Sequence, residues 1–134
     1  MLYFLDSNIC ITFLREGMKA DLVRLKILMY TRKAVQIPSV VSAELMHGAF
    51  KSNNEDNMNK VRRFLSKFVI VPFDFEASEI YGSIRTSLER RGQLISFPDM
   101  LIAATALTHN ATLITNNTQE FSRIDGLNIS DWTI

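Results

Sequence analysis

Residues 2–8 read Leu-Tyr-Phe-Leu-Asp-Ser-Asn, and this stretch decides the fold. The apolar run from Leu2 to Leu5 is typical of a short buried strand, which ends where the acid Asp6 begins. Asp6 or Ser7 can then cap a helix, and Gly17 would stop that helix. The beginning of the chain therefore predicts a strand followed directly by a helix, with an acid at the junction.

The same alternation continues along the chain. Short apolar runs predict further strands at 35–37, 69–73 and 112–115, and a short last strand within 127–134. Helical patterns lie at 21–30, 40–46, 61–68, 75–91 and 100–109, and the polar stretch 51–59 predicts a loop. We expect the 21–30 helix and the almost wholly apolar 100–109 helix to be well buried. Alternating helices and short apolar strands indicate a single α/β domain, residues 1–134, built around a parallel sheet.

The composition favours one globular domain in a reducing compartment. A chain of 134 residues with 47% hydrophobic side chains fits one domain with a proper core. Cys10 is the only cysteine, which excludes an internal disulfide and a zinc–thiolate site and indicates the cytoplasm. No apolar stretch of about 20 residues occurs, so we expect no membrane span. The net charge of +1 gives no general argument for nucleic-acid binding, although basic residues gather at 60–67 and 85–91.

Three acids lie at or within apolar elements of the sequence. Asp6 ends the first strand, Glu44 lies among apolar helix residues, and Asp99 precedes the most apolar helix. Burying a lone carboxylate costs several kcal/mol or forces its protonation, so acids in such places need a partner. Ligands of parallel sheets bind beyond the carboxyl ends of the strands, where Asp6 and the turn 116–117 would meet. Hard oxygen ligands of this kind predict a Mg²⁺ or Mn²⁺ site rather than zinc.

Each acid also has a plainer interpretation, and several protein classes place acids at the edge of a parallel sheet. Asp6 and Asp99 can serve as helix N-caps, and Glu44 can face water at a helix edge. An aspartyl-phosphate phosphatase would carry a second Asp where Asn8 stands, and a receiver-like module would need a Lys near Thr115. A regulatory or binding module with a non-catalytic acidic pocket stays open as the alternative. The coincidence of all three acids favours a metal site.

A resemblance rests on four further stretches of the sequence. They are residues 5–8 (Leu-Asp-Ser-Asn), 39–45 (Ser-Val-Val-Ser-Ala-Glu-Leu), 98–104 (Pro-Asp-Met-Leu-Ile-Ala-Ala) and 113–121 (Leu-Ile-Thr-Asn-Asn-Thr-Gln-Glu-Phe). In order, they resemble the four motifs of VapC-type PIN-domain ribonucleases, the toxin halves of bacterial VapBC toxin–antitoxin pairs. Each motif is weak alone, but four in order over nearly the whole chain are specific. The resemblance implies a three-layer α/β/α sandwich with a parallel central sheet.

The resemblance also implies a chemistry and a set of site residues. The catalytic acids, which would hold one or two Mg²⁺ or Mn²⁺ ions, are Asp6, Glu44 and Asp99. The side chains expected to position substrate are Ser7, Asn8, Thr115 and Asn117. Members of this family are endoribonucleases that cut structured RNA, commonly tRNA. The Thr-Asn-Asn-Thr sequence at 115–118 resembles the subgroup associated with the anticodon region of initiator tRNA, whose cleavage inhibits translation.

Partners follow from the same resemblance. It implies a homodimer and a VapB-like antitoxin that wraps the toxin and blocks its site. It further implies that the toxin–antitoxin complex binds operator DNA through the antitoxin. None of these partners is implied by composition or by spacing.

Two positions depart from the commoner family pattern. Ser7 stands where Thr is frequent, which keeps the hydroxyl, and Asn117 stands where other PIN proteins often carry Asp. An amide oxygen can bind Mg²⁺ but brings no charge, so we expect one ion at most in the free protein, held mainly by Asp6 and Asp99. Glu120 could supply the missing charge, or it could cap a short helix that begins near Thr118.

Overall fold

The core of the fold is a five-stranded sheet in which every paired strand is parallel. The computed structural model describes all 134 residues. The strands are β1 (Tyr3–Leu5), β2 (Val35–Pro38), β3 (Ile70–Val71), β4 (Thr112–Ile114) and β5 (Ile129–Ser130), and their order in the sheet is β3-β2-β1-β4-β5. The central strand β1 pairs with β2 on one side and with β4 on the other. The expected strands are confirmed, although β1, β3, β4 and β5 are shorter than the ranges predicted for them.

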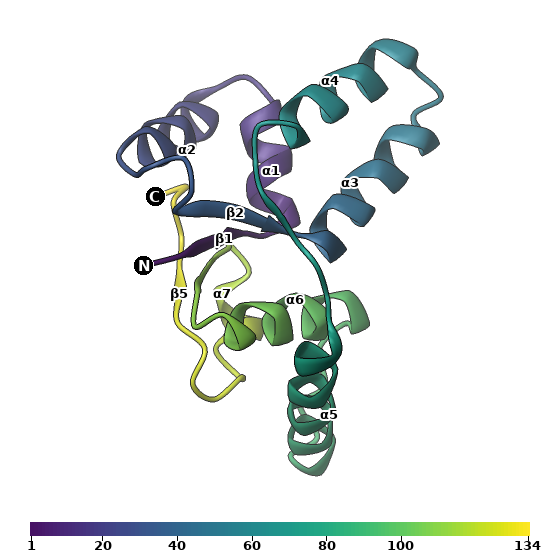
Figure 1. Ribbon diagram of the computed structural model, residues 1–134, viewed down its shortest axis with the longest axis vertical. Coiled ribbons are helices and arrows are strands. Elements are labelled where there is room, and N and C mark those ends of the chain that lie inside the picture. The colour runs from purple at the N-terminus through teal and green to yellow at the C-terminus, as the bar shows by residue number, and fades with distance from the viewer.

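Seven helices connect the strands and cover the sheet on both faces. They are α1 (Ser7–Leu14), α2 (Met18–Leu28), α3 (Ser39–Lys51), α4 (Glu55–Leu65), α5 (Phe75–Arg90), α6 (Phe97–Thr108) and α7 (Thr118–Phe121). Helices α1 to α4 lie on one side of the strands, and α5 to α7 lie on the other (Figure 1). Right-handed crossovers require this division, because the chain moves outward from β1 to β3 and then returns to β4. The result is the expected three-layer α/β/α sandwich.

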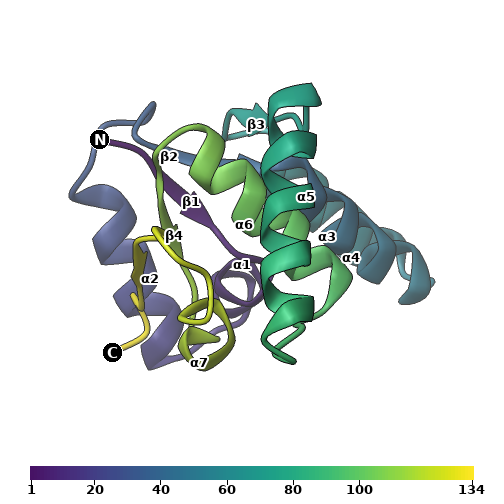
Figure 2. The ribbon, with the colours of Figure 1, turned by 90° about the horizontal axis from the view of Figure 1, so that it is seen from below.

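The core joins the strands to the apolar helix α6. Phe4 and Leu5 of β1 and Leu113 and Ile114 of β4 are fully buried, because central strands of a parallel sheet are covered on both faces. Helix α6 buries six of its residues, as its apolar sequence predicts. Helix α5 packs across the outside of α6 (Figure 2). This packing holds the first turn of α6 rigidly beside the central strands.

The second helix differs from the expectation. Helix α2 begins at Met18, earlier than the predicted Asp21, and it is not well buried, since only Ala20 and Val23 lie in the core. Leu25 is 61% exposed, and Leu28 is 74% exposed. The prediction was wrong because the apolar residues of this helix point in more than one direction, so a high apolar content did not mean a single buried face.

The polar stretch 51–59 was also predicted wrongly, because only residues 52–54 form the connection between α3 and α4. Helix α4 already begins at Glu55, and the side chain of Asn54 caps it by accepting a hydrogen bond from the Asn57 N–H. Glu55 and Asp56 lie in the first turn, where their negative charges are stabilised by the positive end of the helix dipole. Polar residues thus start a helix here.

No helix of the chain is long and apolar enough to cross a membrane.

Candidate functional site

The order of the strands creates a topological switch point at the carboxyl ends of β1 and β4, and we call this edge of the sheet the crevice. The chain leaves β1 toward β2 and leaves β4 toward β5, so the two connections diverge on opposite faces of the sheet. Leu5 is paired with Ile114, and the Asp6 N–H donates to the Ile114 carbonyl at 2.9 Å. Open parallel sheets bind ligands at such a point. Asp6 and the turn after β4 therefore share one edge of the sheet.

Asp6 is buried at this edge and is held from two directions. Only 3% of its surface is exposed. One carboxylate oxygen accepts a hydrogen bond from the Ser7 N–H at 2.8 Å, which makes Asp6 the N-cap of α1. Burial raises the pKa of Asp6, the hydrogen bonds from Thr115 and Ser7 lower it, and the nearby charge of Glu44 raises it, with a net rise. The plain N-cap interpretation of Asp6 is correct, and the same carboxylate also faces the crevice acids.

Thr115 fixes the second oxygen of Asp6. Its hydroxyl donates to Asp6 Oδ2 at 2.7 Å and accepts a hydrogen bond from the Asn117 N–H at 3.0 Å. The Thr115 side chain is fully buried, so neither bond competes with bulk water. One hydroxyl therefore ties the end of β1 to the turn that follows β4, and sets the position of Asp6 relative to Asn117.

Glu44 joins the site through Ser7. Helix α3 starts at the end of β2, next to β1, and its residue Glu44 accepts a hydrogen bond from the Ser7 hydroxyl at 2.5 Å. Glu44 itself is exposed, although its apolar neighbours in the sequence favoured burial. Because water solvates the exposed Glu44 carboxylate, burial of its charge does not require a partner. The bond to Ser7 nevertheless brings it beside Asp6, the residue preceding Ser7.

Asp99 reaches the crevice from the opposite face of the sheet. It lies in the first turn of α6, whose N-cap is Ser96, and the Asp99 N–H donates to the Ser96 hydroxyl at 3.3 Å. The interpretation of Asp99 as an N-cap is therefore wrong, and its carboxylate remains free to face the other acids. Burial raises the pKa of Asp99 to about 6, a hydrogen bond from Ser96 opposes the rise, and the charges of Asp6 and Glu120 add to it.

Asn117 and Glu120 complete the group of polar side chains. The Asn117 side-chain N–H₂ donates to Glu120 Oε2 at 3.0 Å and approaches Asp99 Oδ2 at 3.5 Å. In this orientation, Asn117 presents its donor rather than its oxygen to the acids. Glu120 accepts this side-chain bond and does not cap α7, because the Asn117 N–H is bonded to Thr115. The sequence signal for Glu120 was its place three residues after Asn117, which allows one helical turn to bring both together.

No basic side chain neutralises these acids. The ion pairs of the structure join Arg24 to Asp21 and Arg85 to Glu89, and neither pair includes an acid of the crevice. Burial is the main cause that raises the pKa of Asp6 and of Asp99, and neighbouring carboxylates without a cation add to both rises. No three acidic, histidine or cysteine side chains already converge as a ligand shell. The donor set suits Mg²⁺ or Mn²⁺, and Asp6 and Asp99, with Glu44 and Glu120 beside them, are the residues that could hold an ion.

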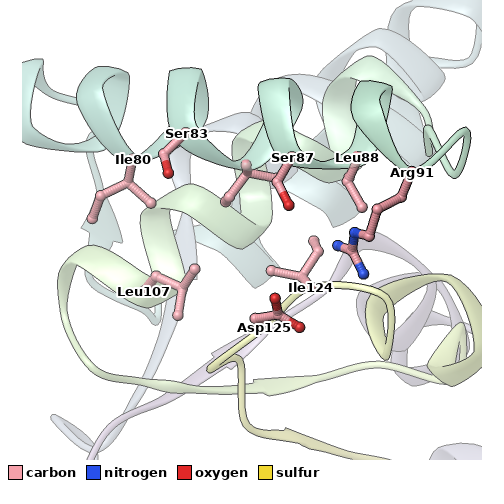
Figure 3. Close-up of a pocket in the computed structure, with 9 residues that line it drawn as sticks. Ile80, Ser83, Ser87, Leu88, Arg91, Leu107, Ile124 and Asp125 are labelled. Atoms are coloured by element: carbon pink, nitrogen blue, oxygen red, sulfur yellow. The ribbon is translucent and has the colours of Figure 1, made fainter.

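Two other features lie outside this group. Asn8, expected to position substrate, is exposed on the first turn of α1. A hollow of about 220 Å³ lies between α5, α6 and the segment at Ile124 and Asp125, and it contains none of the crevice acids (Figure 3). Ser83 and Ser87 of α5 face Leu107 of α6 across it (Figure 3). The acids and this hollow are therefore separate features of the molecule.

Comparisons with known proteins agree with this geometry. The PIN domain family matches residues 3–127. Ribonuclease VapC2 of Rickettsia felis is 39% identical over 98% of both chains, and the tRNA(fMet)-specific endonuclease VapC of Shigella flexneri is 35% identical over 98% of both. Among solved structures, VapBC2 from Rickettsia felis bound to a DNA fragment from their promoter matches with a TM-score of 0.86 and 38% identity, covering 98% of this chain and 99% of that one.

Proposed function

This chain belongs to the PIN-domain family, among its VapC ribonucleases, and on that premise we propose that it is the toxin of a toxin–antitoxin pair that hydrolyses a phosphodiester bond in structured RNA. The observation that carries the proposal is the group of acids at the β1–β4 crevice with no basic partner. We propose tRNA as the substrate, and the anticodon region of initiator tRNA as its place of cleavage. The tRNA(fMet)-specific name of the Shigella relative supports this choice.

Each acid of the crevice has a separate role in the proposed reaction. Asp6, whose oxygens are fixed by Ser7 and Thr115, provides a rigid anchor at the bottom of the site. Asp99 faces it from the first turn of α6. Glu44 is exposed and can orient a water molecule on the open side. In the proposed reaction, a water oxygen attacks phosphorus, the bond to the 3′-oxygen breaks, and the products carry a 5′-phosphate and a 3′-hydroxyl.

A divalent cation is part of the proposal. When bound, Mg²⁺ or Mn²⁺ would stabilise negative charge on the phosphate oxygens and make a nearby water more acidic. The donor chemistry fits, since carboxylates are hard oxygen ligands. The ligands we propose are Asp6 and Asp99, with Glu44 as a further contributor. Asn117 turns its N–H₂ toward the acids, so it would have to rotate before its oxygen could act as a ligand.

The antitoxin partner has a suitable surface on the face of the sheet that carries α1 to α4. A groove of about 270 Å³ between α1, α2 and α4 has an apolar floor that includes Phe13, Ile27 and Phe64, and it is bordered by basic residues. These basic residues are Arg24, Arg32 and Lys67. An acidic amphipathic segment complements such a surface in both polarity and charge. We propose that the antitoxin binds here and places a basic residue, most suitably an Arg, against the acids. Promoter DNA would bind through the antitoxin.

Cleavage by the purified chain tests the enzymatic part of this proposal. With Mg²⁺ or Mn²⁺ it should cut total tRNA, and EDTA should stop it. Asp99→Asn should abolish cutting, whereas Asp125→Asn, a matched change of an exposed acid outside the group, should leave it intact. Cutting that persists in EDTA, or in the Asp99 variant, would contradict the proposed mechanism.

Expression in cells tests the toxin part. The chain alone should stop growth, and co-expression of the cognate antitoxin should restore it. Replacing Arg24 and Lys67 by Glu should weaken the rescue without reducing RNA cleavage, since both residues lie in the groove and away from the acids. Harmless expression of an active enzyme at high level would contradict the toxin assignment.

A further inference from the structure

An aromatic side chain projects into solvent beside the candidate active site. Phe97 is the first residue of α6 and is 56% exposed, although a phenyl ring is usually buried. It precedes Asp99 by two residues on the same helical turn, so the Cα atoms of the two residues are about 5 Å apart. Side chains two residues apart on a helix point in different directions, so the ring lies beside α5 while Asp99 faces the other acids, and the two are separated by less than one helical turn.

The neighbouring helix supports this ring and adds a positive charge. The rings of Phe97 and Tyr81 make an edge contact, with centroids 5.8 Å apart and an interplanar angle of 74°. Arg85 Nη1 donates to the Tyr81 hydroxyl at 2.8 Å, one helical turn along α5. Arg85 also forms an exposed ion pair with Glu89, whose Oε2 lies 3.8 Å from Arg85 Nε, and its side chain is 46% exposed, so the guanidinium remains accessible to a ligand. An exposed ring, a second ring in contact with it and an accessible cation bonded to the second ring are therefore connected, and the first ring belongs to the helical turn that carries Asp99.

We propose that Phe97 is a stacking platform for a nucleobase adjacent to the bond that is cut, with Arg85 available to a neighbouring phosphate. This inference rests on the proposed ribonuclease function. Proteins recognise RNA in loops by stacking unpaired bases on aromatic rings and by pairing arginines with the backbone. A ring on the same turn as Asp99 would fix the position of the scissile phosphate relative to the acids. Phe97 is thus a positioning residue.

Continuity with the acids favours a nucleobase over a second protein chain as the occupant. A protein interface gains most from a broad apolar patch, whereas the immediate neighbours of Phe97 include the polar Ser96, the hydroxyl of Tyr81 and the charge of Arg85. A base has an apolar face and a charged backbone, and this combination matches a ring bordered by a guanidinium.

Fluorescence measures stacking independently of cleavage. Trp132, the only native tryptophan, is buried, so Phe97→Trp introduces one exposed reporter. A 12-nucleotide adenylate RNA should quench this fluorescence, and an abasic ribose-phosphate strand of the same length should not. Phe50→Trp is the matched control, because Phe50 is 60% exposed at the end of α3, and RNA should leave its signal unchanged. Equal quenching by the abasic strand, or no quenching at all, would overturn the inference.

Kinetics and molecular mass complete the test. Phe97→Leu keeps the apolar volume but removes the ring, so it should raise the KM for tRNA about tenfold with a smaller change in kcat, and Phe97→Tyr should restore the KM. Phe50→Leu should match the unmodified chain. A Phe97→Leu variant with unchanged KM, or one that changes the oligomeric mass in sedimentation, would overturn the inference, the latter in favour of a protein interface. If the unmodified chain cuts no RNA, the proposed function fails, and the fluorescence experiment still decides on stacking.

Discussion

The negative charge of Asp99 is destabilised by the fold, but the proposed reaction requires a carboxylate at this position. Burial and the neighbouring acids raise its pKa to about 6, above the ordinary value of 3.8. The folded chain therefore binds this proton more tightly than the unfolded chain does. The stability of the metal-free protein must fall as pH rises from about 4 to about 6, and the cost persists above that window.

Asp99→Asn should therefore stabilise the metal-free protein at pH 7.5. Because Asp99 is partly exposed, solvent screening reduces the gain to about 1 kcal/mol, or roughly 3 °C in Tm. Thermal unfolding in EDTA measures this, and the advantage should vanish below pH 4, where the unmodified Asp99 is protonated in both states. Saturating Mn²⁺ should stabilise the unmodified chain more than the variant. If the unmodified chain and the Asp99→Asn variant have equal Tm values at pH 7.5, the charge of Asp99 does not destabilise the metal-free protein.

Thr115 should matter for both stability and the position of Asp6. Thr115→Val keeps the side-chain shape but removes the hydroxyl that donates to Asp6 and accepts from the Asn117 N–H. Leaving the buried Asp6 oxygen and the half-buried Asn117 N–H without this bond should cost about 1–3 kcal/mol of unfolding free energy. Urea denaturation measures the loss, and Thr115→Ser, which keeps the hydroxyl, serves as the control. If Val and Ser variants unfold alike, the hydroxyl does not hold the site together.

At the scale of elements, the turn from β4 into α7 brings Glu120 to the other acids. The Asn117 amide lies between Glu120 and Asp99, where its N–H₂ offers partial positive charge to both. Glu120→Gln keeps the shape and removes one charge, so it should lower Mn²⁺ affinity about tenfold, as loss of a supporting ligand typically does. Calorimetric titration measures the affinity, with Asp125→Asn as a matched control. Unchanged affinity would mean that Glu120 does not act on the ion.

Asn117→Asp replaces a neutral amide with a carboxylate, so this variant should bind Mn²⁺ more tightly than the unmodified chain.

In helix α2, some apolar side chains are buried and others are exposed. Val23 is fully buried, whereas Leu25 is 61% exposed. Val23→Ala should cost about 1–3 kcal/mol of unfolding free energy, and Leu25→Gln should change it by less than about 0.5 kcal/mol. Chemical denaturation of the chain without partners measures both. A large loss in the Leu25 variant would show that this face is covered in solution, for instance by a second copy of the chain.

The elements also show which features the sequence could predict. Short apolar strands and the apolar helix α6 were predicted correctly, because buried elements of a parallel sheet have continuous apolar sequences. Helix α4 was predicted to start too late, since its first turn is polar and its cap, Asn54, looks like a loop residue. The acids could be named from their neighbours in the sequence. Their distances could not, because the hydrogen bonds through Ser7, Thr115 and Asn117 join parts of the chain that only folding brings together.

At the scale of the whole molecule, strand order explains why distant residues share one site. Strand β1 is the central strand, and the chain departs from β1 and β4 on opposite faces of the sheet. Asp6 and Thr115 therefore meet at the crevice, α6 brings Asp99 from one face, and α3 brings Glu44 from the other. Helices α1, α2 and α4, which line the basic groove, lie on the same side of the sheet as α3, the helix that carries Glu44 (Figure 1). The groove contains none of the acids, so the proposed surface for the antitoxin is distinct from the proposed catalytic edge.

The ends of the cut RNA test the central claim most directly. A reaction in which the acids direct water at phosphorus leaves a 5′-phosphate and a 3′-hydroxyl, without using the ribose 2′-hydroxyl. Fragments of tRNA made by the purified chain with Mn²⁺ should therefore be ligatable at the 3′ end without phosphatase treatment, and Asp6→Asn should yield no fragments. Fragments that end in a 2′,3′-cyclic phosphate, or undiminished cutting by Asp6→Asn, would contradict the account.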